Sequence, residues 1–108
     1  MQTVIHLTRG LELVAKIPDE HKNAHILDTQ GWLEYQRGNH EAAIQALERA
    51  KEADESPIVH LHLGLAYLKV NNLVQARTAL EKALENGGRG LSNQDKEEAK
   101  KALEKLNA

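Results

Sequence analysis

Histidine is the residue type in this chain best suited to hold a metal ion, and four of the six histidines form two close pairs. His21 and His25 are four residues apart, so they could share one helical face, a spacing that can hold zinc. Lys22 stands where a metalloprotease helix carries glutamate, and no third ligand is evident. His60 and His62 would point about 200° apart on a helix. We expect structural histidines and no metal site; a site shared between two molecules stays open as the alternative.

Serines, paired acids and a glycine-rich loop offer little for catalysis. Ser56 and Ser92, the only serines, are placed as helix N-caps. Glu97 and Glu98 complement the dipole at the start of a mixed-charge helix. The loop 87–90 could bind an anion through backbone N–H groups, but it lacks the Lys-Ser/Thr of a phosphate-binding loop. The sequence therefore predicts no enzyme activity, no catalytic residue and no cofactor.

Composition excludes further classes of function. A formal net charge of −2 and only three aromatic residues argue against a nucleic-acid surface. With no cysteine the chain has no disulfide and no thiolate metal site. The apolar runs are short and broken by polar residues, so we expect no signal peptide and no membrane insertion by this segment. At 108 residues, one domain is expected, and its compartment is unknown from composition.

Helix start and stop signals recur along the chain. Ser56-Pro57 is typical of an N-cap followed by a proline in the first turn. Gly38-Asn39 and Asn71-Asn72 are each typical of a helix end followed by the next N-cap. No stretch alternates apolar and polar residues as a strand would. Six helices are expected, at residues 2–17, 22–37, 40–54, 57–70, 73–86 and 93–107. The connections between them are short, so neighbouring helices should be antiparallel.

Two parts of the chain repeat each other at an offset of 33 residues, with 27–54 aligned on 60–87. Half of the identical pairs are glycine or alanine at helical spacings, which is typical of stacked helical hairpins. They are Gly31/Gly64, Asn39/Asn72, Ala43/Ala76, Ala46/Ala79, Leu47/Leu80, Glu48/Glu81, Ala50/Ala83 and Glu52/Glu85.

The segment His-Leu-His-Leu-Gly-Leu-Ala-Tyr at 60–67, followed by alanines and a leucine on the next helix, resembles a tetratricopeptide repeat (TPR). In that pattern the glycine lets the two helices of a hairpin approach closely. The earlier copy matches less well: Gln30 replaces the expected leucine, and Tyr35 sits one place after the family's tyrosine, where Glu34 stands. The glycine between the helices is Gly38 in one copy and Asn71 in the other.

The resemblance implies an all-α fold, a TPR-type right-handed solenoid of antiparallel helical hairpins and about six helices. It divides one domain, 1–108, into a half repeat (2–17), two repeats (22–54 and 57–86) and a C-terminal capping helix (93–107). A narrower likeness, carried by 26–33 and 57–60, is to the C-terminal repeats of bacterial proteins linked to exopolysaccharide and surface-protein export. It implies a cytoplasmic or periplasmic segment of a longer repeat protein.

Within this family the first helix of each hairpin lines the concave, partner-binding face. On helix 57–70 the family core stripe comprises Val59, Leu63, Ala66, Tyr67 and Val70, and a second apolar stripe comprises Ile58, Leu61, Leu65 and Leu68. Trp32 and Tyr35 fall on the same side of the previous first helix. The sequence predicts a protein-interaction module that binds a peptide or helix of a partner in an apolar groove. The predicted contact residues are Asp28, Trp32, Tyr35, Ile58, Leu61, Leu65, Leu68 and Lys69.

Two alternatives remain open for these residues. Neighbouring helices could bury them as core, or a second copy of the chain could cover them in a homodimer. Capture of a partner's terminal carboxylate on this face is rejected, because only Lys69 is basic there.

Overall fold

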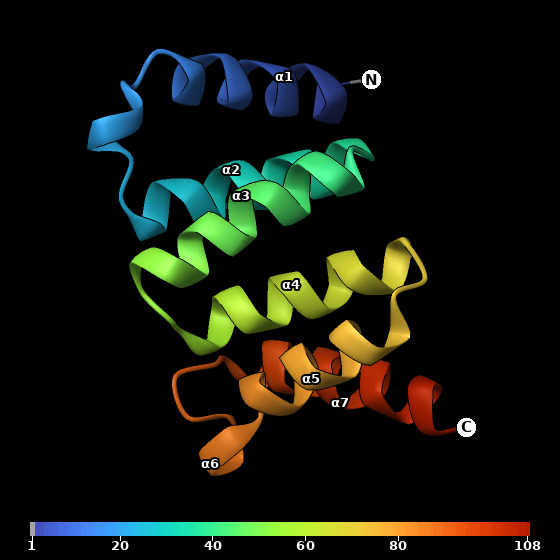
Figure 1. Cartoon of the computed structure of the whole chain (residues 1–108). Coiled ribbons are helices and arrows are strands. Elements are labelled where there is room, and N and C mark those ends of the chain that lie inside the picture. The colour runs from blue at the N-terminus through green and yellow to red at the C-terminus, as the bar shows by residue number, and fades with distance from the viewer. Residues whose placement is uncertain (1) are drawn as a thin grey trace. The chain divides into compact units, whose positions relative to one another are not determined.

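The computed structural model describes residues 2–108, with side chains from His6 onward, and places them in two compact units, Met1–Asp54 and Glu55–Ala108. The described residues are 82% helical and contain no strand, which confirms the all-α, TPR-type fold. The helices are α1 (Gln2–Ala15), α2 (Ala24–Arg37), α3 (His40–Ala53), α4 (Pro57–Lys69), α5 (Leu73–Ala83), α6 (Glu85–Gly88) and α7 (Asn93–Asn107), with a 3₁₀ turn η1 (Asp19–His21) (Figure 1). None of the helices in the described part is long and apolar enough for a membrane span.

In the first unit, α2 and α3 form an antiparallel hairpin and α1 packs against α2 (Figure 1). Leu7 and Val14 of α1 are buried. The helix expected over 2–17 ends at Ala15, because Ile17 closes a tighter turn on the Val14 carbonyl before Pro18.

Each hairpin is held together by a glycine on its first helix that faces a leucine on its second. A Cβ on Gly31 would lie 2.5 Å from Leu47 Cγ, and one on Gly64 would lie 2.6 Å from Leu80 Cγ. These separations are far shorter than any real carbon–carbon contact, so only glycine permits this helix spacing. The close approach expected from the sequence is confirmed in both hairpins.

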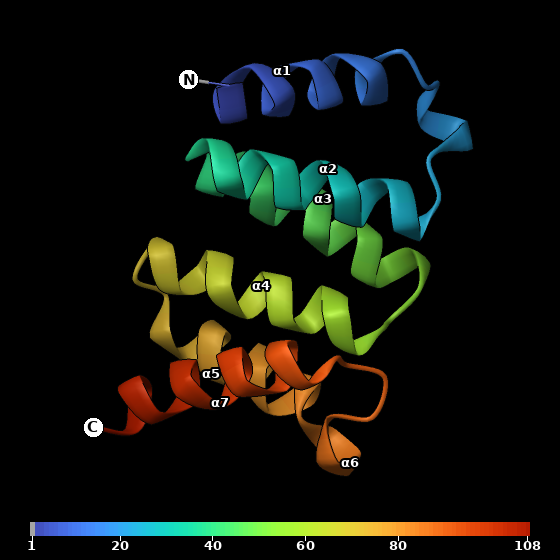
Figure 2. The ribbon, with the colours of Figure 1, turned by 180° about the vertical axis from the view of Figure 1, so that it is seen from behind.

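In the second unit, α7 packs against α5 and also contacts α4, and it buries Ala99 and Ala102 (Figure 2). The helix expected over 73–86 ends at Ala83, which corrects the prediction. Asn86 and Gly87 have positive φ angles of 56° and 71°, so the chain leaves the right-handed helical region there.

The turns inside the two hairpins have the same conformation. Gly38 has a φ of 95° and Asn71 a φ of 62°. In each turn the following asparagine donates its backbone N–H back into the preceding helix, to the carbonyl of Glu34 or Tyr67 at 2.9 Å. Val70, expected in the core, is 40% exposed instead, because α4 ends one residue before it.

Candidate functional site

The predicted contact residues belong to two groups, one on α2 in the first unit and one on α4 in the second. On α2, Asp28, Trp32 and Tyr35 follow one another at spacings of four and three residues, which places them along one helical face. All three side chains are half-buried.

The rings of Trp32 and Tyr35 stack face to face. Their centroids lie 4.7 Å apart and their planes differ by 6°. His40, the first residue of α3, extends the arrangement: its ring centroid lies 5.5 Å from that of Tyr35, with an interplanar angle of 25°. Trp32, Tyr35 and His40 therefore form an ordered aromatic surface, which we call the α2 aromatic face. The sequence-based prediction missed His40, which lies five residues after Tyr35, on the other side of the Gly38 turn.

The group on α4 is more deeply buried. Leu61 is 1% exposed and Leu65 8% exposed, whereas Ile58 and Leu68 are half-buried and Lys69 is exposed. The placement of Leu61 and Leu65 favours the core alternative that the sequence leaves open. Partner contact by Ile58, Leu68 and Lys69 stays a prediction.

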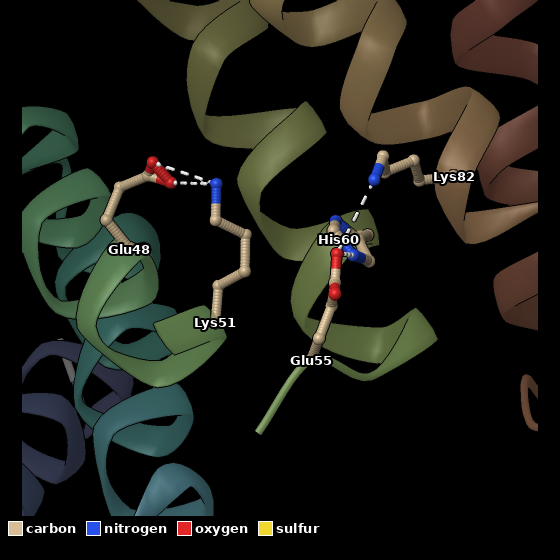
Figure 3. Close-up of polar contacts among 5 residues, drawn as sticks. All are labelled: Glu48, Lys51, Glu55, His60 and Lys82. Carbon is tan, nitrogen blue, oxygen red and sulfur yellow. Dashed lines mark hydrogen bonds and ion pairs between the residues drawn. The ribbon is translucent and has the colours of Figure 1, made fainter. Parts of the chain in front are cut away.

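A polar cluster lies at the start of α4, and none of its residues is among those that the sequence singles out for partner contact. The carboxylate of Glu55 accepts a hydrogen bond from His60 Nε2 at 3.0 Å, and Lys82 Nζ of α5 lies 3.6 Å from the same oxygen, Oε1 (Figure 3). Hydrogen bonding by His60, with the nearby positive charge of Lys82, lowers the pKa of Glu55. The His60 side chain is 8% exposed and that of Glu55 is 57% exposed.

This cluster opens into a pocket of about 290 Å³. The polar side chains of its lining include those of Glu55, Ser56, His60, Lys82, Glu85 and Arg89. Ser56 stands at the N-cap of α4, as expected, but its hydroxyl caps no backbone N–H, whereas Ser92 Oγ accepts a hydrogen bond from the Asp95 N–H at 3.1 Å. The sequence could not reveal the pocket, because Glu55 and Lys82 are far apart along the chain.

Other ion pairs lie outside this pocket, and most of them join residues one helical turn apart. Figure 3 also draws Glu48 and Lys51, one turn apart on α3, with Lys51 Nζ 2.7 Å from Glu48 Oε1. Asp19 of η1 lies 3.2 Å from Lys22 Nζ and 3.6 Å from Arg49. Among the residues that the structure describes, no group of three or more potential ligands could hold a metal ion.

Exposed apolar side chains that the sequence-based prediction did not single out lie at two places. Leu73 and Val74, at the start of α5, are 47% and 78% exposed, beside the exposed Val70. Leu13 on α1 is 57% exposed.

Comparison with known proteins yields one family. Residues 8–83 match the family described as "Anaphase-promoting complex, cyclosome, subunit 3", which is a repeat family of TPR type. The match includes both hairpins, from the second half of α1 to the end of α5. None of the curated proteins matches the chain.

Proposed function

Because this chain belongs to the family of anaphase-promoting complex (cyclosome) subunit 3, we propose that it is a protein-interaction module that binds a partner through the α2 aromatic face. TPR-type repeats generally mediate protein–protein interaction and are typically non-enzymatic scaffolds. The family match supports the general class of function, and the geometry of α2 supports the choice of surface.

The stacked pair of Trp32 and Tyr35 is the observation that carries this choice. Tryptophan and tyrosine are the residue types most enriched among the side chains that dominate binding energy. The stack holds both rings in one orientation, so little side-chain freedom is lost when a partner binds. The two rings are half-buried, which leaves part of each accessible.

The partner that fits is an apolar or amphipathic peptide segment. Flat aromatic surfaces favour aliphatic or aromatic side chains. Asp28, one turn before Trp32 on the same face, adds a negative charge that suits a basic residue near the apolar one. A helix with one apolar stripe flanked by lysine or arginine satisfies both requirements.

Trp32 is the only tryptophan of the chain, so its fluorescence reports directly on this surface. The test selects peptides from a display library of amphipathic helices against the whole chain, and then titrates the selected peptides while the emission is recorded. We expect a saturable change in emission. For Trp32→Ala and Tyr35→Ala we expect about tenfold weaker binding by calorimetry.

Leu13→Ala and Val74→Ala are the matched controls, because both remove an exposed apolar side chain elsewhere on the chain. Their affinities should equal that of the unsubstituted chain. Equal binding by Trp32→Ala, with its fold verified by circular dichroism, would contradict the proposal. If the chain instead forms a concentration-dependent dimer that Trp32→Ala abolishes, the partner of this surface is a second copy of the chain and not a foreign peptide.

Leu61→Ser and Leu65→Ser decide the role of the α4 group. Because both leucines are buried, each change should destabilise the fold by roughly 3 kcal/mol, measured by urea unfolding. Unchanged stability together with lost peptide binding would show that these leucines contact the partner and are not part of the core.

A further inference from the structure

We propose that the pocket at the start of α4 binds a peptide segment with two neighbouring carboxylates, and that Glu55 occupies the place of one of them when no peptide is bound. This site is separate from the α2 aromatic face and does not depend on it. Its ligand is defined by acidity, whereas the α2 aromatic face selects apolar side chains.

Three nitrogen-bearing side chains from three parts of the second unit line the pocket. His60 comes from α4, Lys82 from α5, and Arg89 from the segment after α6. His60 is buried, so its imidazole is held in place by packing rather than by the ligand. All three can donate hydrogen bonds to a carboxylate, and arginine can do so with two parallel bonds.

Glu55 already shows that a carboxylate fits between two of these groups. Its Oε1 receives the His60 hydrogen bond and lies beside Lys82 (Figure 3). The Glu55 side chain is nevertheless 57% exposed and lies in the short segment between α3 and α4. An ion pair this exposed is weakly held, so an external carboxylate can replace it at small cost.

Arg89 provides the reason why a second carboxylate is required. Among the described residues it is exposed and has no hydrogen bond or ion pair. One carboxylate of the ligand would take the place of Glu55 beside His60 and Lys82, and the other would pair with Arg89. The second contact is absent when Glu55 is in place, and it favours the ligand over Glu55.

Charge balance limits the affinity. In the lining, the positive charges of Lys82 and Arg89 balance the negative charges of Glu55 and Glu85. Glu85 remains when Glu55 is displaced, and it repels an acidic ligand. We therefore expect modest affinity in the unsubstituted chain and stronger binding when either glutamate is neutralised.

The test uses the dipeptide N-acetyl-Glu-Glu-amide as the probe, with N-acetyl-Gln-Gln-amide as its neutral counterpart, and follows the amide and imidazole signals of the whole chain by NMR. In Glu55→Gln we expect saturable shifts at Ser56, His60, Lys82 and Arg89, with binding about fivefold tighter than in the unsubstituted chain. Adding Arg89→Ala should weaken that binding about tenfold. Adding Lys101→Ala, which removes an exposed lysine of α7 outside the pocket lining, should leave it unchanged.

Three results would overturn the proposal. The first is the absence of saturable shifts in Glu55→Gln when its spectrum shows a native fold. The second is an equal loss of binding with Lys101→Ala and Arg89→Ala, which would indicate unspecific attraction to positive charge. The third is binding of inorganic phosphate at these residues without binding of the dipeptide, which would assign the pocket to a phosphate group. Since this dipeptide carries no apolar side chain, failure here leaves the test of the α2 aromatic face unaffected.

Discussion

The hairpins α2–α3 and α4–α5 agree in the contact between their two helices and differ in the rest of the first helix. In both hairpins a glycine faces a leucine at a distance that admits no Cβ. The alanines that precede and follow each leucine on the second helix are buried in both. A contact limited by backbone separation tolerates only the smallest side chains, so the two copies cannot diverge there.

The first helices show the opposite behaviour. On α4 every residue from Val59 to Ala66 is buried, whereas α2 buries only Leu27 and Gly31. Equivalent positions therefore have different roles: Trp32 is half-buried on α2, and its counterpart Leu65 is buried on α4. Repeat position alone does not decide burial, because each helix has different neighbours.

A difference between the two repeats at one buried position should also affect stability. The equivalent residues there are Gln30 in the first hairpin and Leu63 in the second. Leu63 is 1% exposed. The Gln30 side-chain oxygen is buried and finds no hydrogen-bond partner among the described residues. A buried polar atom without a partner destabilises a fold. The glutamine is therefore a weak point in the first hairpin that the second hairpin lacks.

Exchanging these two residues has the largest expected effect. Leu63→Gln should lower the free energy of unfolding by about 3 kcal/mol, because it removes apolar contacts and buries an amide. Gln30→Leu should raise it by about 1 kcal/mol, because it removes the unsatisfied oxygen. Urea unfolding followed by circular dichroism measures both changes. A loss of stability in Gln30→Leu as large as that in Leu63→Gln would show that the first hairpin requires its glutamine, and would contradict the prediction.

The glycines at the helix contact come next. Gly31→Ala and Gly64→Ala should each destabilise the chain by about 1–2 kcal/mol, because the new Cβ overlaps the branch carbon of a leucine. Gly10→Ala is the matched control. Its Cβ would lie 3.0 Å from Leu33 Cδ1, the mobile end of a side chain, and alanine favours the helix. A loss with Gly10→Ala as large as with Gly64→Ala would contradict the overlap explanation.

The turns between the helices should show a smaller effect. Gly38→Ala and Asn71→Ala should each cost about 1 kcal/mol, because alanine disfavours positive φ. Gly38→Asn should cost less than Gly38→Ala, because asparagine already occupies the equivalent turn. Thermal unfolding measures all three variants, and identical melting temperatures for Gly38→Asn and Gly38→Ala would argue against a conformational cause.

The acid dependence of stability should show the smallest effect, in both units. Lys22, followed by Arg49, lowers the pKa of Asp19, and His60, followed by Lys82, lowers that of Glu55. Because its pKa is lowered in the folded state, such a carboxylate stabilises the fold at pH values above its ordinary pKa, which is 4.5 for Glu55. This stabilisation is lost as the pH falls through the pKa of the folded state. Asp19→Asn and Glu55→Gln should each weaken the fall in melting temperature between pH 6 and pH 3, roughly the range of carboxylate titration. Because both carboxylates are exposed, salt should reduce the effect. An unchanged acid dependence in the double variant would show that these pairs contribute nothing.

The helix starts are the part of the fold that is best predicted from sequence. The observed starts of α3, α4, α5 and α7 coincide with the expected residues 40, 57, 73 and 93. N-cap and proline signals depend on a few adjacent residues, so they can be recognised without knowledge of the fold. The end at Ala83 was missed because Leu84 and Glu85 continue the helical composition, and only the backbone angles of Leu84, a φ of −94° and a ψ of 2°, reveal the break.

The candidate sites were predicted less completely. The spacing of Asp28, Trp32 and Tyr35 places them on one face of α2, since helical periodicity is local, and their contact with a partner stays a prediction. The same periodicity placed Leu61 and Leu65 on a stripe that could be surface or core, and only the structure shows them buried. The pocket beside His60 was not predicted, because its ionisable side chains come from separate segments.

By itself, the sequence determined that the chain forms helical hairpins of TPR type, where most of those helices begin, and that a glycine on the first helix allows the two helices of a hairpin to approach closely. These properties follow from local capping, from helical period and from a repeat of 33 residues. The tertiary structure alone decided which apolar residues of α4 are buried, how Trp32, Tyr35 and His40 stack, and that Glu55 reaches His60 and Lys82. Burial and charge pairing depend on neighbours brought together by packing, and sequence spacing does not encode those neighbours.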